Sequence, residues 1–106
     1  MNSKLQDLSE IVARANDLFY SKVEHIDTLM GIMDKTLRKQ GMKADAITID
    51  CVVLDKKIVL LLHDDKPDVV SITLGNKEGE IYSSSEYELA QVSEAFIMEI
   101  MQVNFT

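Results

Sequence analysis

The densest group of chemically capable side chains in this sequence is a histidine followed by three aspartates: His63, Asp64, Asp65 and Asp68. Imidazole nitrogen and carboxylate oxygen both bind divalent metal ions, so the segment is a candidate metal site. Its spacing differs from that of an EF-hand loop, which needs alternating oxygen ligands, a central glycine and a final glutamate. The aspartates and Pro67 are also typical of a surface turn. We therefore expect a solvated turn, with a metal-binding or small-ligand-binding domain as the alternative hypothesis.

Cys51 is the one cysteine of the chain, and it could act as a nucleophile if His25 or His63 lay beside it. Its place between Ile49 and Val53, in a segment of alternating character, predicts an inward-facing side chain. A buried free cysteine usually behaves as a small hydrophobic residue. A weak hydrolase that combines Cys51 with the histidine-containing turn therefore belongs to the same alternative hypothesis.

Other patterns that carry catalysis are missing from the sequence. The chain has only four glycines and neither of the glycine-rich motifs that cradle nucleotide phosphates. The run Ser83-Ser84-Ser85 could bind an anion at a helix N-terminus, but it is equally an ordinary helix cap. Nothing near Asp45, Asp50 or Asp55 would separate the pKa values of two carboxylates, as acid–base catalysis requires. We expect a protein that is not an enzyme and that uses no cofactor.

The charge balance of the chain narrows its possible partners. Eleven Lys and Arg stand against 18 Asp and Glu, which gives a formal net charge of −7. Binding to nucleic acid or to an anionic membrane draws its affinity from cationic side chains, so we expect neither partner. A basic protein or peptide is electrostatically more natural. The acidity also leaves open a mimic of nucleic acid that blocks a basic site, although no regular acidic array supports that idea.

The compartment can be predicted from cysteine usage and from the N-terminal residues. A single cysteine cannot form an intramolecular disulfide, whereas small secreted domains often depend on several. The first residues lack the apolar stretch of a signal peptide, and the longest apolar run, 58–62, is too short to span a bilayer. We expect a cytoplasmic protein whose residues 1–106 form one domain.

Apolar residues at spacings of three and four run from Leu5 to Leu37, which predicts an amphipathic N-terminal helix. A continuous helix over Leu5–Gln40 would be about 54 Å long at 1.5 Å per residue. That length exceeds the dimensions of a compact domain of this size. Either the helix breaks, near Tyr20–Lys22 or at Gly31, or its far end packs on a second subunit.

The remaining sequence predicts strands and a second helix. Alternation over 47–54 and 69–74, and a wholly apolar segment at 58–62, indicate three strands joined by turns. A fourth, short strand is expected at 80–82. A helix then begins at Ser85 with Glu88 as its capping partner, and Leu89, Val92, Phe96, Ile100 and Val103 mark its core face. The predicted fold is α+β: a long, possibly broken N-terminal helix, a three- to four-stranded antiparallel meander and a C-terminal helix.

This fold leaves more apolar surface than two helices on one face of the sheet would cover. Two helices on opposite faces would cover it, and methionines that simply fill the core would account for part of it. We favour self-association, because a protruding helix and a two-faced apolar sheet both point to a second subunit. The expected function is a non-enzymatic protein-interaction module, resembling small acidic chaperones, adaptors or immunity-type inhibitors and acting as a homodimer. The interface candidates are Phe19, Ile26, Met30, Met33, Val52, Leu54, Val59 and Leu61.

Overall fold

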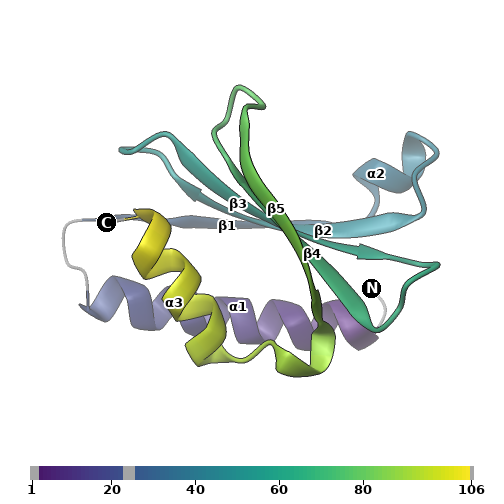
Figure 1. Cartoon of the computed structure of the whole chain (residues 1–106), viewed down its shortest axis with the longest axis horizontal. Helices are drawn as coiled ribbons and strands as arrows, with labels where there is room; N and C mark the ends of the chain where they lie inside the picture. Colours follow the sequence, from purple (N-terminus) through teal and green to yellow (C-terminus); the bar gives the residue numbers. More distant parts are fainter. Residues whose placement is uncertain (1–2, 23–25, 106) are drawn as a thin grey trace.

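The computed structural model describes residues 3–22 and 26–105, and these form an α+β fold. A helix opens the chain, five strands follow, and a second long helix closes it (Figure 1). The elements are α1 (Ser3–Lys22), β1 (Leu29–Met33), the one-turn helix α2 (Thr36–Lys39), β2 (Ala44–Cys51), β3 (Lys56–His63), β4 (Val69–Gly75), β5 (Ile81–Glu88), a 3₁₀ turn (Leu89–Gln91) and α3 (Glu94–Phe105).

The sheet is an antiparallel meander in the order β1-β2-β3-β4-β5, so every strand pairs with its neighbour in the sequence. This confirms the predicted topology, with five strands where three or four were expected. Short turns make such neighbouring pairs the simplest arrangement, because a two-residue to five-residue loop brings adjacent strands together. In the central pair, Ile49 lies opposite Ile58 and Ile47 lies opposite Leu60.

The first strand was missed, because its residues were assigned to the N-terminal helix. α1 ends at Lys22, within the segment where a break was considered, and Leu29–Met33 then pairs with β2. A five-residue apolar run carries too little periodicity to separate a helix from a strand. Gly31 weakens a helix by about 1 kcal/mol relative to alanine, and it lies opposite Thr48 in the sheet.

Both long helices pack on the same side of the sheet (Figure 1), where α1 also contacts α3. Spacings of three and four along α1 place one row of side chains in the core, and Phe19 meets the ring of Phe105 edge to face with centroids 6.1 Å apart. The core is a single cluster that joins both helices to the strands. Its members are Leu5, Leu8, Val12, Ala15, Phe19, Ile47, Ile49, Cys51, Ile58, Leu60, Leu62, Val70, Ile72, Val92, Ile97, Met98, Met101 and Phe105.

The central strand β3 is buried on one face and half-buried on the other. Ile58, Leu60 and Leu62 belong to the core, whereas Val59 and Leu61 between them are only partly covered. The alternative in which the two helices cover opposite faces of the sheet is therefore wrong. A wholly apolar run predicts a strand, but it does not say whether the second face is covered within the same chain.

The C-terminal part of the chain departs from the prediction in a second way. Residues expected to begin a helix at Ser85 instead extend β5 to Glu88, and α3 begins only at Glu94. The cap is provided by Ser93, whose hydroxyl accepts a hydrogen bond from the Phe96 amide at 3.2 Å. Pairing with β4 along its whole length holds the serine run in the sheet.

The turn between β4 and β5 depends on a glycine. A β-carbon on Gly75 would lie 2.1 Å from the carbonyl oxygen of Glu80, which is far inside van der Waals contact. The register also shifts at Leu74 and Gly75, so that Ile81 lies opposite Gly75. This bulge turns the Ile81 side chain toward the face of the sheet opposite the helices.

No helix in the described part of the chain is long and apolar enough to cross a membrane.

Replacing Phe19 with alanine should lower the free energy of unfolding by about 3–5 kcal/mol, because a fully buried ring leaves a cavity beside Phe105. Tyr20→Ala is the matched control, since Tyr20 is 60% exposed and its loss should cost less than about 0.5 kcal/mol. Urea unfolding followed by circular dichroism measures both. Equal effects of the two substitutions would show that Phe19 is not a core residue.

Candidate protein-interaction surfaces

His63, Asp64, Asp65 and Asp68 lie where β3 ends and turns into β4. His63 ends β3 and is half-buried, and the three aspartates follow on the surface. Two of the aspartates already bind cationic side chains. Lys4 of α1 contacts Asp68 at 3.0 Å, and Arg38 of α2 contacts Asp64 at 2.8 Å.

Arg38 joins two carboxylates that are far apart in the sequence. Its Nε and one terminal nitrogen donate to Asp45 at 2.9 Å each, and its two terminal nitrogens donate to Asp64 at 2.8 Å each. The hydrogen bonds that Arg38 donates to Asp64 and Asp45 raise the pKa of Arg38, and those to Asp64 lower the pKa of that carboxyl group. Because the Asp45 carboxylate is buried, this contact positions α2 against the start of β2.

The described residues do not combine these groups into a metal centre. Among them, no three His, Cys, Asp or Glu side chains lie close enough together to hold a metal ion. Cys51 is 1% exposed in the core, as its place in the alternating segment predicted. His25, the other suggested partner of that thiol, lies outside the described residues. Asp50 pairs with Lys57 across β2 and β3 at 3.7 Å.

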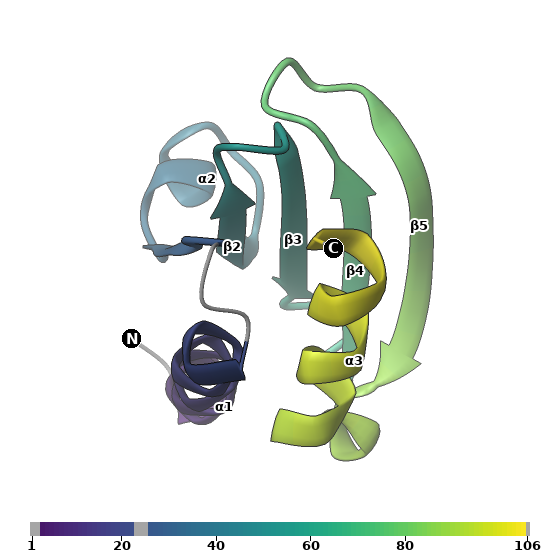
Figure 2. The same ribbon diagram turned by 90° about the vertical axis from the view of Figure 1, so that its left-hand side faces the viewer.

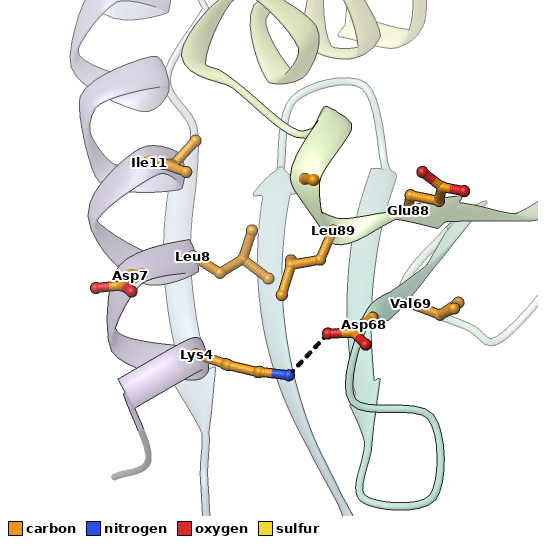
Figure 3. A pocket seen from close by; sticks show the side chains of 9 residues that line it. Lys4, Asp7, Leu8, Ile11, Asp68, Val69, Glu88 and Leu89 are labelled. Carbon is orange, nitrogen blue, oxygen red and sulfur yellow. Dashed lines mark hydrogen bonds and ion pairs between the residues drawn. The ribbon is translucent and has the colours of Figure 1, made fainter.

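A cavity of about 550 Å³ lies between the N-terminal half of α1 and the junction of β5 with the 3₁₀ turn (Figure 3). Leu8, Ile11 and Leu89 form its apolar wall, and the Lys4–Asp68 ion pair borders it. Asp7 and Glu88 complete the polar rim. None of the lining residues is a histidine, cysteine, serine or threonine, so this lining offers no nucleophile of these types.

The face of the sheet opposite α1 and α3 is a second candidate surface, which we call the open face. Apart from α2 beside the start of β2, no described element lies over it (Figure 1). Near the bulge it is hollowed, with a volume of about 350 Å³ bordered by Val59, Leu61 and Ile81. On the three central strands the open face consists of Ala46, Thr48, Asp50, Lys57, Val59, Leu61, Ser71 and Thr73.

Exposed apolar side chains gather at one end of the sheet, where β1 and β5 begin and β2 turns into β3. We call this group the apolar end. Val53 is 76% exposed and Ile81 is 67% exposed, although such side chains are usually buried. Ile81 also borders the hollow of the open face, so the two surfaces are continuous. The apolar end comprises Leu29, Val52, Val53, Leu54, Ile81 and Tyr82.

The predicted interface residues fall into three groups. Phe19 was wrongly assigned, because it is fully buried within the chain, and Ile26 and Met30 pack partly buried against the same core. Val59 and Leu61 lie on the open face, as does Met33 at the edge of the sheet. The last group, Val52 and Leu54, lies in the exposed turn of the apolar end rather than on the second face of a strand.

Sequence reasoning found only the start of β5, as the short strand expected at 80–82. Seven of its eight residues are exposed, and it forms an outer edge of the sheet. Its continuation through Ser83-Ser84-Ser85 was missed, because that run was assigned to a helix cap at Ser85. Because Tyr87 packs on Phe96 of α3 with ring centroids 5.0 Å apart, the strand is held at that end.

Removing the Arg38 guanidinium should destabilise the protein more than removing the Asp64 charge. Arg38→Gln takes two hydrogen bonds from the buried Asp45 carboxylate, whereas Asp64→Asn alters only a half-exposed pair. Urea unfolding at pH 7 measures both variants, and a larger loss in Asp64→Asn would contradict this order.

The contribution of Asp64 should also depend on pH. Because its pKa is lower in the folded protein than in the unfolded chain, the stabilisation is present above the ordinary aspartate pKa of about 3.9. It is lost as the pH falls through the lowered value. The stability difference between wild type and Asp64→Asn should therefore shrink on acidification below pH ~4.

Comparison with protein-family models, with curated proteins and with solved structures gives no match for this chain.

Proposed function

We propose that this protein is a non-enzymatic protein-interaction module that acts as a homodimer through its open face. The observation that carries the proposal is a sheet with helices on one side and half-buried valine and leucine on the other. Val59 and Leu61 lie at the centre of that uncovered side, and Ile81 extends it to the apolar end. Contiguous apolar surface of this kind is typical of an interface.

The charges favour a second copy as the occupant of the open face. On β2, β3 and β4 this face carries one carboxylate from Asp50 and one ammonium from Lys57, and these two groups pair with each other. Two chains of net charge −7 repel one another unless their excess carboxylates stay apart. Contact through these three strands keeps the excess carboxylates, including Glu86 of β5 on the same face opposite Ser71, outside the centre of the joint. A two-fold axis would bring Val59 and Leu61 of both copies together.

Among interaction proteins, the proposal corresponds to small acidic chaperones, adaptors and immunity-type inhibitors. In this proposal the dimer presents its acidic outer surfaces to another protein. The metal-binding alternative gains no support from the described residues, because Asp64 and Asp68 at the histidine-containing turn already pair with Arg38 and Lys4. We therefore propose no second function.

Val59→Glu should convert the dimer to a monomer, because two carboxylates would be buried against each other in an apolar joint. Thr73→Glu, on the same face of the neighbouring strand, should act in the same direction with less risk to folding. Native mass spectrometry and light scattering after size-exclusion chromatography measure the mass. Far-ultraviolet circular dichroism shows that each variant is folded.

The matched control is Val103→Glu, which adds the same charge on α3, where Val103 is 73% exposed on the helical side of the molecule. It should remain a dimer. A monomeric wild type at tens of micromolar would refute the homodimer, and a dimer that survives both Val59→Glu and Thr73→Glu would refute the open face as its interface.

A further inference from the structure

We propose that the outer edge of β5 binds an extended basic segment of another protein, which joins the sheet as a sixth strand. This inference rests on the proposed interaction function and names the chemistry of its partner. It uses the outer edge of β5, whereas dimerisation is expected at the centre of the open face on β2, β3 and β4, and Glu86 opposite Ser71 lies at the margin between the two.

The backbone of β5 has an unpaired outer edge. β4 occupies one side of this strand, and Figure 2 shows β5 as the outermost strand with no described element beyond it. About half of the backbone N–H and C=O groups of an edge strand point outward and can pair with another chain. Edge strands are usually short, bent, or guarded by lysine or proline. β5 contains neither lysine nor proline, and its bulge is confined to its first residues beside Leu74 and Gly75, so the edge from Ser83 to Glu88 is open to pairing.

A groove beside β5 provides the second part. On the helical side, the space between β5 and α3 is hollowed by about 310 Å³. Ile72 and Leu74 of β4 form its floor, and Phe96, Ile100 and Val103 of α3 form its wall. The small side chains of Ser83 and Ser85 leave this groove accessible from the edge. A strand added to β5 would direct alternate side chains toward this groove, as expected when peptides bind by strand addition.

The charges around the edge of β5 indicate which kind of segment would bind there. Glu80 precedes β5, Glu86 and Glu88 lie on it, and Glu99 borders the groove. Lys66 contacts Glu86 at 3.3 Å, but both side chains are more than half exposed, so this pair is weak. Among the described residues, no lysine or arginine forms an ion pair with Glu80, Glu88 or Glu99. Lysine or arginine in the added strand would supply the missing positive charge.

The same charges argue against a second copy at this edge. Two β5 strands joined edge to edge would bring Glu86 and Glu88 of both chains to one seam to which neither strand contributes a lysine or arginine, and the like charges repel. The partner we infer therefore alternates apolar and basic residues, with the apolar ones directed into the groove and the basic ones toward Glu86 and Glu88. Ser84 lies on the same face as these two glutamates.

The test uses a nine-residue synthetic peptide in which lysine alternates with valine, titrated into the full-length protein by calorimetry. Two further peptides serve as controls. One replaces lysine with glutamate, and the other keeps lysine but carries an N-methyl group on every backbone amide. N-methylation preserves charge and removes the hydrogen bonds that a paired strand needs. We expect binding of the first peptide only, an affinity that falls with added salt, and slowed hydrogen exchange at β5 amides.

Charge reversal on β5 tests whether its glutamates recognise the basic peptide. The double variant Glu86→Lys with Glu88→Lys should weaken binding of the lysine peptide roughly tenfold and favour the glutamate peptide. The matched control, Glu10→Lys with Asp17→Lys, changes the net charge equally on exposed positions of α1 and should bind as wild type does. Equal weakening in both double variants would reduce the effect to net charge and overturn the proposal.

Other outcomes are equally decisive. Absence of binding, equal binding of the N-methylated peptide, or protection confined to the open face would each refute strand addition at β5. Repeating the titration on Val59→Glu separates the two proposals. Peptide binding by the monomeric variant would support the β5 site independently of dimerisation. A wild-type dimer that does not bind the peptide would refute the β5 site and would still agree with the proposed dimerisation.

Discussion

The packing of α1 and α3 together on one face of the sheet is the constraint on which the rest of this structure depends. Phe19 and Phe105 close that layer near the ends of the two helices, and apolar side chains from β2, β3 and β4 complete it. Because both helices take the same side, the opposite side has no cover beyond α2 at its corner. The helical layer also stops short of β5, whose inner face opens into a groove. Both proposed binding surfaces are therefore consequences of where the two helices lie.

The two surfaces differ in the physical interaction that each offers. The open face presents valine, leucine and threonine around a single neutralised ion pair, so it can bury apolar area against an identical face. The edge of β5 presents unpaired backbone and glutamates, so it favours hydrogen bonds and a partner of opposite charge. An acidic dimer with a basic partner on each outer edge satisfies both requirements at once.

The sequence patterns predicted the strands of the sheet more reliably than they predicted which face of the sheet the helices pack on. Alternation at Ile47, Ile49 and Cys51 correctly identified the buried face of β2, because side chains in a strand alternate between the two sides. The apolar run at 58–62 did not reveal that one of its sides is uncovered. A half-buried valine and a fully buried isoleucine look alike in a sequence, and the placement of helices is decided by contacts distant along the chain. The same reason explains why Phe19 was taken for an interface residue.

The candidate sites were harder to predict than the fold. The Arg38 contact links α2 to carboxylates at positions 45 and 64, and no local pattern announces such a pairing. The edge of β5 was overlooked because Ser85 and Glu88 have the spacing of a capping box, which is a local signal that pairing with β4 overrides. The sequence correctly predicted that the histidine-containing turn lies between two strands.

The contact between α1 and α3 also governs the order in which the molecule can assemble during synthesis. Every strand pairs with the strand made just before it, so the sheet can grow step by step as the chain leaves the ribosome. α3, however, is made after all five strands. Until α3 is made, the part of the apolar row of α1 that contacts it stays uncovered. The nascent chain therefore exposes the interior face of a nearly complete sheet until its last helix emerges. That interval is when this protein would be most prone to aggregation and most dependent on a chaperone.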